Sequence, residues 1–394
     1  MQNPPLSKLA QRLAAPEADV WSIHYDAVAR QAAGEDVILM SVGDPDFATP
    51  EYIIEQVVDS IHANRTHYSP AQGEPAMLQA LAELESNGTG RSFTPENFVV
   101  LPGATAGLFA TLAAICDPGD EVVVPEPMYI GYVSMEKALD IRLVGVPMDM
   151  HAEIGQQVDV DALLAAVTDR TRAVLINTPG NPIGNMIPPH LLKRLAGSLA
   201  ERGIWLISDE VYSLLTFEER HVSLLNCAEE LHNIVVIDGL SKSHAMTGWR
   251  IGWVCGPPAL IKAVCNYTGA AFFGCSQFIQ DAAVYALQHN DAHVASMRSE
   301  YQRRRDYLIA RLEQMPGFGY IKPQAGMFLM LDTGQVADSG ETFARRLLEQ
   351  QGVSVVPGLG FGKNCDQFVR VSLTHDVQVI GAACDRIAAF VDQP

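Results

Sequence analysis

One lysine and one arginine in a polar segment carry the strongest chemical signal in this sequence. The segment spans residues 238–253, reads DGLSKSHAMTGWRIGW, and follows a short apolar run, Ile234–Ile237. Within it, Lys242 lies between two serines and Arg250 follows eight positions later. A lysine amine can condense with an aldehyde to form an imine, and serine and arginine side chains can hold a phosphate dianion. These groups together suit a ligand that carries both an aldehyde and a phosphate.

The ligand with both groups is pyridoxal 5′-phosphate. Taken alone, a lysine and an arginine at this spacing are more often a solvated loop after a strand. The rest of the chain must therefore decide between a cofactor site and an ordinary loop.

The bulk properties of the chain exclude several classes of protein. Its 394 residues are 48% hydrophobic, which is enough for a large core and two or three domains. A net charge of -19 disfavours nucleic acid and anionic membranes as partners. Seven scattered cysteines without a CxxC pair indicate neither a disulfide framework nor a metal site. There is no signal-like N-terminus and no apolar run of about 18 residues, so we expect a cytoplasmic protein.

Short apolar runs that alternate with helical patterns predict the fold class. The predicted strands of the main sheet are 98–101, 121–125, 173–177, 204–208, 234–237 and 251–255. Strands of this kind, separated by helices, indicate an α/β fold with a mostly parallel, seven-stranded type of sheet between helices. We expect three parts: an N-terminal arm (1–45) on the small domain, a large cofactor-binding domain (46–289) and a small α+β domain (290–394). Within a predicted helix at 293–314, the cluster Arg303–Arg305 is expected to face solvent.

Polar residues follow these strands where a ligand of such a sheet would bind, at the carboxyl ends. The residues are Gly103, Ala104, Thr105, Asn181, Asp209, Tyr212, Ser241 and Lys242. A glycine turn that opens a helix at 103–105 would also offer backbone N–H groups to a phosphate. The coincidence of these residues at one edge favours the cofactor site over a solvated loop.

Each part of a pyridine cofactor then has a candidate partner. The Asp209 carboxylate would keep the ring nitrogen protonated, although it could instead cap the segment that follows. Tyr212 and Asn181 would donate hydrogen bonds to the phenolic oxygen. Tyr129 would stack on the ring or, alternatively, belong to the core.

Arg370 lies in the middle of an apolar strand, Phe368–Ser372. If it is buried it needs an anionic partner, and the carboxylate of an amino acid is an apt one. The alternative is an edge-strand arginine that faces water.

Several segments, in the same order along nearly the whole chain, resemble the fold-type-I aminotransferases of class I/II. They are Ser241–Trp253, Asn181-Pro-Ile-Gly184, Asp209-Glu-Val-Tyr212, Gly43–Phe47, Tyr68–Gly73, Asp117–Asp120 and Phe368–Ser372. The resemblance implies a homodimer that exchanges amino groups between amino acids and keto acids by ping-pong chemistry on pyridoxal 5′-phosphate.

The resemblance also implies individual roles. Lys242 would be the imine and proton-shuttle lysine, and Tyr68 would reach the cofactor of a second subunit. Arg370 would bind the substrate carboxylate with help from Asn181 and the Gly43 backbone. Asp209, Tyr212, Asn181 and Tyr129 would contact the ring, whereas Ser241, Arg250, Gly103, Ala104 and Thr105 would hold the phosphate.

Two departures from the family pattern, Ile183 and Phe328, are expected to affect the substrate pocket. The segments Trp21–Tyr25, Ser41–Phe47 and Leu240–Trp249 look most similar to arginine–pyruvate transaminases. The candidate acidic partners for a guanidinium substrate are Asp19 and Glu17 in the N-terminal arm.

Other functions remain open at this point. The chain could be a broad, aromatic or aspartate-type aminotransferase, or a carbon–sulfur β-lyase on the same fold. A ligand-sensing regulator with an aminotransferase-like domain would need a DNA-binding domain, and about 40 residues precede Gly43 here. The acidic charge also disfavours that function.

Overall fold

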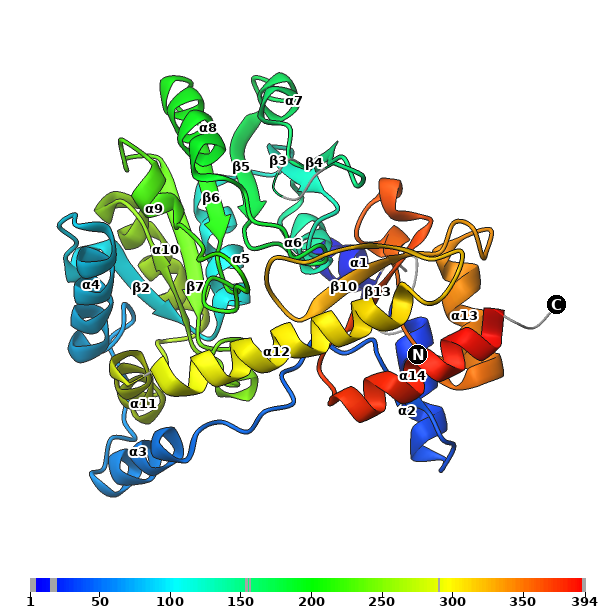
Figure 1. The fold of residues 1–394 in the computed structure, drawn as a ribbon. Coiled ribbons are helices and arrows are strands. Elements are labelled where there is room, and N and C mark those ends of the chain that lie inside the picture. Colours follow the sequence, from blue (N-terminus) through cyan, green and yellow to red (C-terminus); the bar gives the residue numbers. More distant parts are fainter. Residues whose placement is uncertain (1–4, 15–19, 153–154, 156, 290, 392–394) are drawn as a thin grey trace.

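A computed structural model describes residues 5–14, 20–152, 155, 157–289 and 291–391. Its centre is a seven-stranded sheet in the order β2-β8-β7-β6-β5-β3-β4 (Figure 1). The strands are β2 (Phe98–Leu101), β3 (Glu121–Glu126), β4 (Arg142–Pro147), β5 (Thr171–Asn177), β6 (Trp205–Asp209), β7 (Ile234–Gly239) and β8 (Gly252–Cys255). All are parallel except β8, which runs antiparallel to both of its neighbours. The predicted fold class is therefore confirmed.

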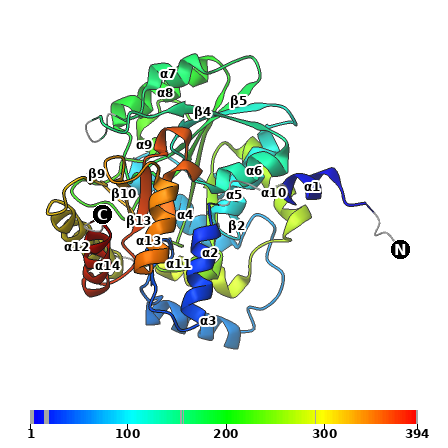
Figure 2. The same ribbon diagram turned by 90° about the vertical axis from the view of Figure 1, so that its right-hand side faces the viewer.

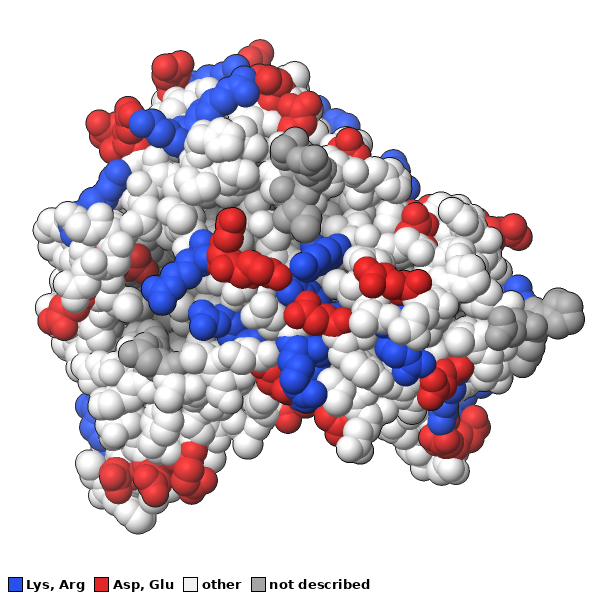
Figure 3. Space-filling view, in the orientation of Figure 1, with Lys and Arg blue, Asp and Glu red and all other residues white. Residues whose placement is uncertain are grey.

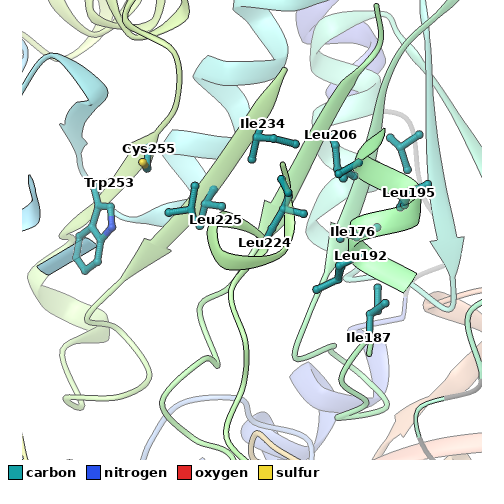
Figure 4. Packing of buried hydrophobic residues seen from close by; sticks show 14 of the residues in the cluster. Ile176, Ile187, Leu192, Leu195, Leu206, Leu224, Leu225, Ile234, Trp253 and Cys255 are labelled. Atoms are coloured by element: carbon teal, nitrogen blue, oxygen red, sulfur yellow. The ribbon is translucent and has the colours of Figure 1, made fainter. Parts of the chain in front are cut away.

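Both faces of this sheet are buried, which explains the continuous apolar runs in its strands. Alternate residues such as Val99, Val122 and Val235 pack with helices on one face, and Val100, Val123 and Val236 pack on the other. Figure 4 shows part of the second face, where Leu192 and Leu195 of a helix meet Ile176 and Leu206 of neighbouring strands. Period-two side chains can be apolar throughout only when helices cover both sides.

The helices divide between the two faces. The first face carries α5 (Ala104–Ile115), α6 (Gly131–Leu139) and α10 (Pro258–Ala271). The second carries α4 (Pro75–Thr89), α7 (Val160–Ala165), α8 (Pro189–Glu201), α9 (Leu224–Cys227) and α11 (Gln277–Gln288), and α3 (Glu51–His62) packs on α11.

Strand β4 was not predicted. It lies at the edge of the sheet, where several of its side chains are exposed. Its sequence therefore lacks the continuous apolar run of the central strands.

A second, antiparallel sheet has the order β12-β13-β10-β9. Its strands are β9 (Gly319–Ile321), β10 (Phe328–Asp332), β12 (Val356–Pro357) and β13 (Phe368–Ser372). The helices α13 (Gly340–Gln351) and α14 (Val377–Val391) pack with it in one core. Helix α12 (Asp291–Leu312) links the two sheets and crosses the front of the molecule (Figure 1).

The N-terminal segment contacts both parts of the molecule. Helix α2 (Ser22–Ala32) packs against α13, and β1 (Ile38–Leu39) pairs with β11 (Val353–Ser354). Helix α1 (Lys8–Ala14) instead lies beside α6 (Figure 2), where Arg12 Nε donates to the Lys137 carbonyl at 2.9 Å. The division into 1–45, 46–289 and 290–394 stays a proposal.

The prediction of a solvated Arg303–Arg305 cluster is wrong for two of its three members. Arg304 is buried and bonds both carboxylate oxygens of Asp46, at 2.7 and 2.9 Å. Arg305 is 1% exposed and pairs with Glu218. Helix α12 packs against both parts of the protein, so the consecutive residues Arg304 and Arg305 are both buried. Buried guanidinium groups need anionic partners.

Within the described ranges, no helix has the length and apolar character needed to cross a membrane. All seven cysteines are free thiols.

Candidate active site

A cavity of about 400 Å³ lies at the edge of the large sheet where the parallel strands end. Most of the predicted site residues line it: Gly43, Ala104, Thr105, Tyr129, Asn181, Asp209, Tyr212, Ser241, Lys242, Arg250 and Arg370. The reversed direction of β8 brings Arg250 to this edge, because β7 ends at the edge and β8 starts from it. Of the remaining two candidates, Gly103 lies behind Arg250, and Tyr68 lies elsewhere.

Lys242 reaches the cavity from the loop after β7. Its Nζ donates a hydrogen bond to the Gly43 carbonyl at 2.7 Å. Burial lowers the pKa of the Lys242 amine to about 8, with Asp44 acting in the opposite direction. Near pH 8 a large share of this amine is neutral, which is the form that attacks a carbonyl carbon or accepts a proton.

Asp209 ends β6 and is 3% exposed. Its Oδ2 accepts a hydrogen bond from the Tyr132 hydroxyl at 2.8 Å. Burial raises the pKa of the Asp209 carboxyl to about 6, against the Tyr132 hydrogen bond, which lowers it. No described cation forms an ion pair with this carboxylate. A protonated ring nitrogen in the cavity would supply the missing partner, so Asp209 fits a pyridine cofactor.

No role was predicted for Tyr132, yet its side chain donates the hydrogen bond that holds Asp209. It lies in the first turn of α6, three positions after Tyr129, and is fully buried. The two rings meet edge to face at 5.4 Å, with Tyr129 against the cavity and Tyr132 not part of its lining. Residues three apart share one side of a helical turn. That spacing is the signal that could have identified Tyr132.

The opposite end of the cavity suits a phosphate. Ala104 and Thr105 open α5, whose first N–H groups have no partner within the helix. Gly103 has φ +92, and a Cβ there would lie 2.5 Å from Arg250 Nη2. Arg250 donates to the Thr247 and Pro102 carbonyls, and no ion pair joins it to a described carboxylate. The Arg250 guanidinium is therefore held against the backbone at Gly103. Because it has no described carboxylate partner, it is available to bind an anion.

Arg370 lies on β13 and is 3% exposed. It donates to Asn181 Oδ1 and to the Ser41 carbonyl, each at 3.1 Å, while its Nε has no hydrogen-bond partner. Its guanidinium lies 4.0 Å from the Phe328 ring centroid. Burial lowers the pKa of Arg370 to about 10, because no described carboxylate offsets the loss of water. A buried guanidinium with a free donor fits a carboxylate ligand.

Asn181 is positioned by the residue that ends β5. The Asn181 N–H donates to Asn177 Oδ1 at 2.7 Å, and Asn177 Nδ2 donates to the Asp209 carbonyl at 2.9 Å. Tyr212 is buried beside them, and burial raises the pKa of its hydroxyl. Hydrogen bonds therefore tie the ends of β5 and β6 together, and with them the two side chains that would face the cofactor.

Several residues without a predicted role complete the cavity, among them Trp21, His24, Asp44 and Ile130. His24 Nδ1 lies 2.9 Å from Ser41 Oγ. Burial, followed by the charge of Arg370, lowers the pKa of His24. The N-terminal segment thus supplies part of the wall of the cavity.

The two departures from the family pattern have different locations. Phe328 lines the cavity, whereas Ile183 is buried in the core of the large sheet. Asp19 and Glu17 lie outside the described residues.

Tyr68 does not line the cavity. Its side chain is 82% exposed and packs edge to face on Phe273, with the ring centroids 4.9 Å apart. The prediction that Tyr68 reaches a second subunit stays a prediction.

Comparison with known proteins agrees with this geometry. The family model described as aminotransferase class I and II matches residues 35–387. The chain is 41% identical to an arginine–pyruvate transaminase of Pseudomonas aeruginosa, over 97% of both chains. It is 33% identical to an aspartate aminotransferase of Geobacillus stearothermophilus, over 98% of this chain and 99% of the relative. The solved structure of Thermus thermophilus aspartate aminotransferase with maleate superposes with a TM-score of 0.92 at 32% identity, covering 98% of this chain and all of the other.

Proposed function

Because the chain belongs to the class I and II aminotransferases, we propose that its cavity holds pyridoxal 5′-phosphate and an amino-acid substrate together. The observation that carries this proposal is the arrangement of Lys242, Asp209 and Arg250 around one cavity. Each has the chemistry for one part of the cofactor: an amine, a carboxylate without a cation and a guanidinium without a carboxylate.

In this proposal Arg250, Ser241, Gly103, Ala104 and Thr105 hold the phosphate. Asp209 holds the proton of the ring nitrogen, Tyr212 and Asn181 donate to the phenolic oxygen, and Tyr129 covers the ring. When bound, the cofactor supplies an electron-accepting ring that makes the substrate Cα–H bond acidic.

The protein supplies the proton transfer and the orientation of the substrate. The neutral amine of Lys242 would accept the proton of the substrate Cα as a base, and the resulting ammonium would give that proton up again as an acid. A pKa of about 8 suits both tasks near neutral pH. Arg370 and the Gly43 backbone bind the α-carboxylate, which fixes the Cα–H bond in front of Lys242.

For the substrates, we propose arginine as amino donor and pyruvate as acceptor. The similarity to the Pseudomonas arginine–pyruvate transaminase supports this choice. The cavity also contributes Asp44, and in the described lining the cations are Lys242, Arg250 and Arg370, all with other roles. A second substrate carboxylate therefore finds no further Lys or Arg among the described lining residues, which disfavours aspartate.

A donor panel tests the proposal. The holoenzyme is given arginine, aspartate or phenylalanine, each with pyruvate, and alanine formation is measured. We expect alanine from arginine at the highest kcat/KM. Turnover of aspartate or phenylalanine with none of arginine would overturn the donor and keep the reaction class. Pyruvate and ammonia from a cysteine conjugate without an acceptor would instead identify a carbon–sulfur β-lyase.

We further propose a cytoplasmic homodimer with shared sites. Tyr68 and Phe273 are 82% and 62% exposed and lie against each other, an apolar pair on the surface that a second copy of the chain would cover. Sedimentation velocity gives the mass in solution, and a monomer would contradict the dimer.

A further inference from the structure

A second cavity, of about 590 Å³, lies between the first turns of α12 and the loop at residues 213–221. Its polar lining residues are Ser213, Thr216, Arg220, His221 and Arg298. None of them lines the active-site cavity. In Figure 3, which shows the face crossed by α12, Lys and Arg side chains gather along the middle of the molecule.

The two arginines of this cavity differ in their partners from the later arginines of α12. Neither Arg220 nor Arg298 forms an ion pair or a side-chain hydrogen bond with any described residue. The next arginines of α12 differ, because Arg303, Arg304 and Arg305 all pair with carboxylates. In a chain with a net charge of -19, two unpaired guanidiniums at one cavity are a local excess of positive charge.

Other donors and the walls of the cavity are consistent with a small ligand. Thr216 is buried, and its hydroxyl is not used in any described hydrogen bond. The His221 side chain is 4% exposed, with Nε2 3.1 Å from Glu210 Oε2. Leu214, Val294 and Ala295 form the apolar part of the wall.

A neighbouring cavity of about 240 Å³ is lined by carboxyl groups, and its described lining residues include no arginine. It shares Ser213, Leu214 and His221 with the first and contains the carboxylates Glu85, Glu210 and Asp238. Burial raises the pKa of Glu85 to about 7 and the pKa of Asp238 well above its ordinary value. The carboxylate favoured in its charged form is thus Glu210, which faces His221. The favourable position for an anion is therefore at the two arginines.

We propose that the cavity of Arg220 and Arg298 binds a small oxyanion, a carboxylate or a phosphate group, at a site separate from Arg370 and Arg250. Guanidinium groups bind both kinds of anion through charge-assisted hydrogen bonds. Arg220 and Asp209 lie on one chain segment, residues 209–221. Near the two ends of this segment, His221 pairs with Glu210. The ligand of the site would therefore contact the same loop that carries Asp209 and Tyr212.

Calorimetric titration of the holoenzyme tests the site, with inorganic phosphate in one series and succinate in the other. Arg220→Gln and Arg298→Gln should each weaken the binding of at least one probe by about tenfold or more, the usual scale for a lost charged hydrogen bond. Arg303→Gln is the matched control: it removes an exposed, paired arginine of the same helix and should leave the affinity unchanged. Melting temperatures check that all three variants fold.

The response to the two probes identifies the ligand group. A loss confined to phosphate indicates a phosphate group, and a loss confined to succinate indicates a carboxylate. The site is overturned if neither probe binds, if neither probe loses affinity in the two cavity variants, or if Arg303→Gln weakens binding as much. Transamination plays no part in this readout, so the result stands apart from the proposed function.

Discussion

The Tyr132 hydroxyl donates a hydrogen bond to Oδ2 of Asp209 at 2.8 Å, and both side chains are buried. This bond favours the charged form of Asp209, a carboxylate of the active-site cavity that has no ion pair with a described cation. Tyr132 does not line the cavity, so it acts on the reaction through Asp209 and is a positioning residue.

Tyr132→Phe should lower kcat/KM by about tenfold and the free energy of unfolding by about 1–2 kcal/mol, because a buried carboxylate loses a hydrogen bond. The pKa of Asp209 should also rise, since the bond from Tyr132 lowers it. The acidic limb of the kcat/KM–pH profile should therefore move to higher pH. Tyr25→Phe, at an exposed position, is the control. A loss of stability with an unmoved profile would leave Tyr132 a structural role only.

Lys242→Ala should abolish nearly all turnover, by about a thousandfold or more, because it removes both the attacking amine and the proton carrier. Binding of pyridoxal phosphate should persist, since Arg250, Ser241 and Asp209 remain. Cofactor retention after gel filtration and single-turnover product formation measure the two effects. Lys193→Ala, which removes an exposed lysine paired with Glu229, should behave as the parent protein. Activity near the parent level in Lys242→Ala would refute the mechanism.

Arg370→Lys should raise KM for amino acids by about tenfold to a hundredfold, because an ammonium cannot replace the planar guanidinium as a two-point partner of a carboxylate. Slow reaction of a simple amine without a carboxylate should change little. Steady-state kinetics with both substrates distinguish the outcomes. Equal losses for amine and amino acid would mean that Arg370 does not bind the carboxylate.

In the cofactor-free protein, the charged form of Asp209 should lower the free energy of unfolding, by an amount that depends on pH. Its pKa is about 6, above the ordinary 3.8, so the folded state binds this proton more tightly than the unfolded state does. The cost of the buried charge therefore grows as the pH rises from about 4 to about 6, and reaches on the order of 3 kcal/mol. Urea unfolding measures the free energy of unfolding at pH 4.5 and pH 7. Relative to the parent protein, Asp209→Asn should be more stable at pH 7 than at pH 4.5, by up to that amount. A constant difference between the two proteins would refute the shift.

Mixed dimers test whether Tyr68 acts across an interface. Lys242→Ala is inactive, and Tyr68→Ala should be impaired. If Tyr68 completes the site of the partner, exchange of subunits forms one site with both residues intact, and activity should exceed the sum of the separate variants. If the sum is not exceeded after confirmed exchange, Tyr68 does not act across the interface.

The sequence was most informative where local chemistry and sheet topology coincide. The apolar runs identified six strands of the large sheet, and the polar residues after them, from Thr105 to Lys242, do line one cavity. The runs could not indicate that β8 is reversed, because an apolar strand reads the same in either direction. Yet that reversal is what brings Arg250 to the site.

Residues defined by long-range contacts were less predictable. Tyr132 and His24 depend on partners 77 and 17 positions away. Arg304 and Arg305 read as a solvated cluster because their partners, Asp46 and Glu218, come from distant loops. Such long-range contacts determine whether a charged side chain can be buried, and the local sequence pattern does not reveal them.

The contact between Gly43 and Phe328 has a consequence for changing the substrate range of this enzyme. A Cβ at Gly43 would lie 2.8 Å from Phe328 Cζ, and the same ring supports the guanidinium of Arg370. A side chain introduced at position 43 would therefore push the ring against Arg370 and disturb carboxylate binding for every substrate alike. Engineering of donor selectivity is better started at Trp21 or Ile130, which line the cavity and belong to the apolar cluster of Phe361 instead of that of Phe328.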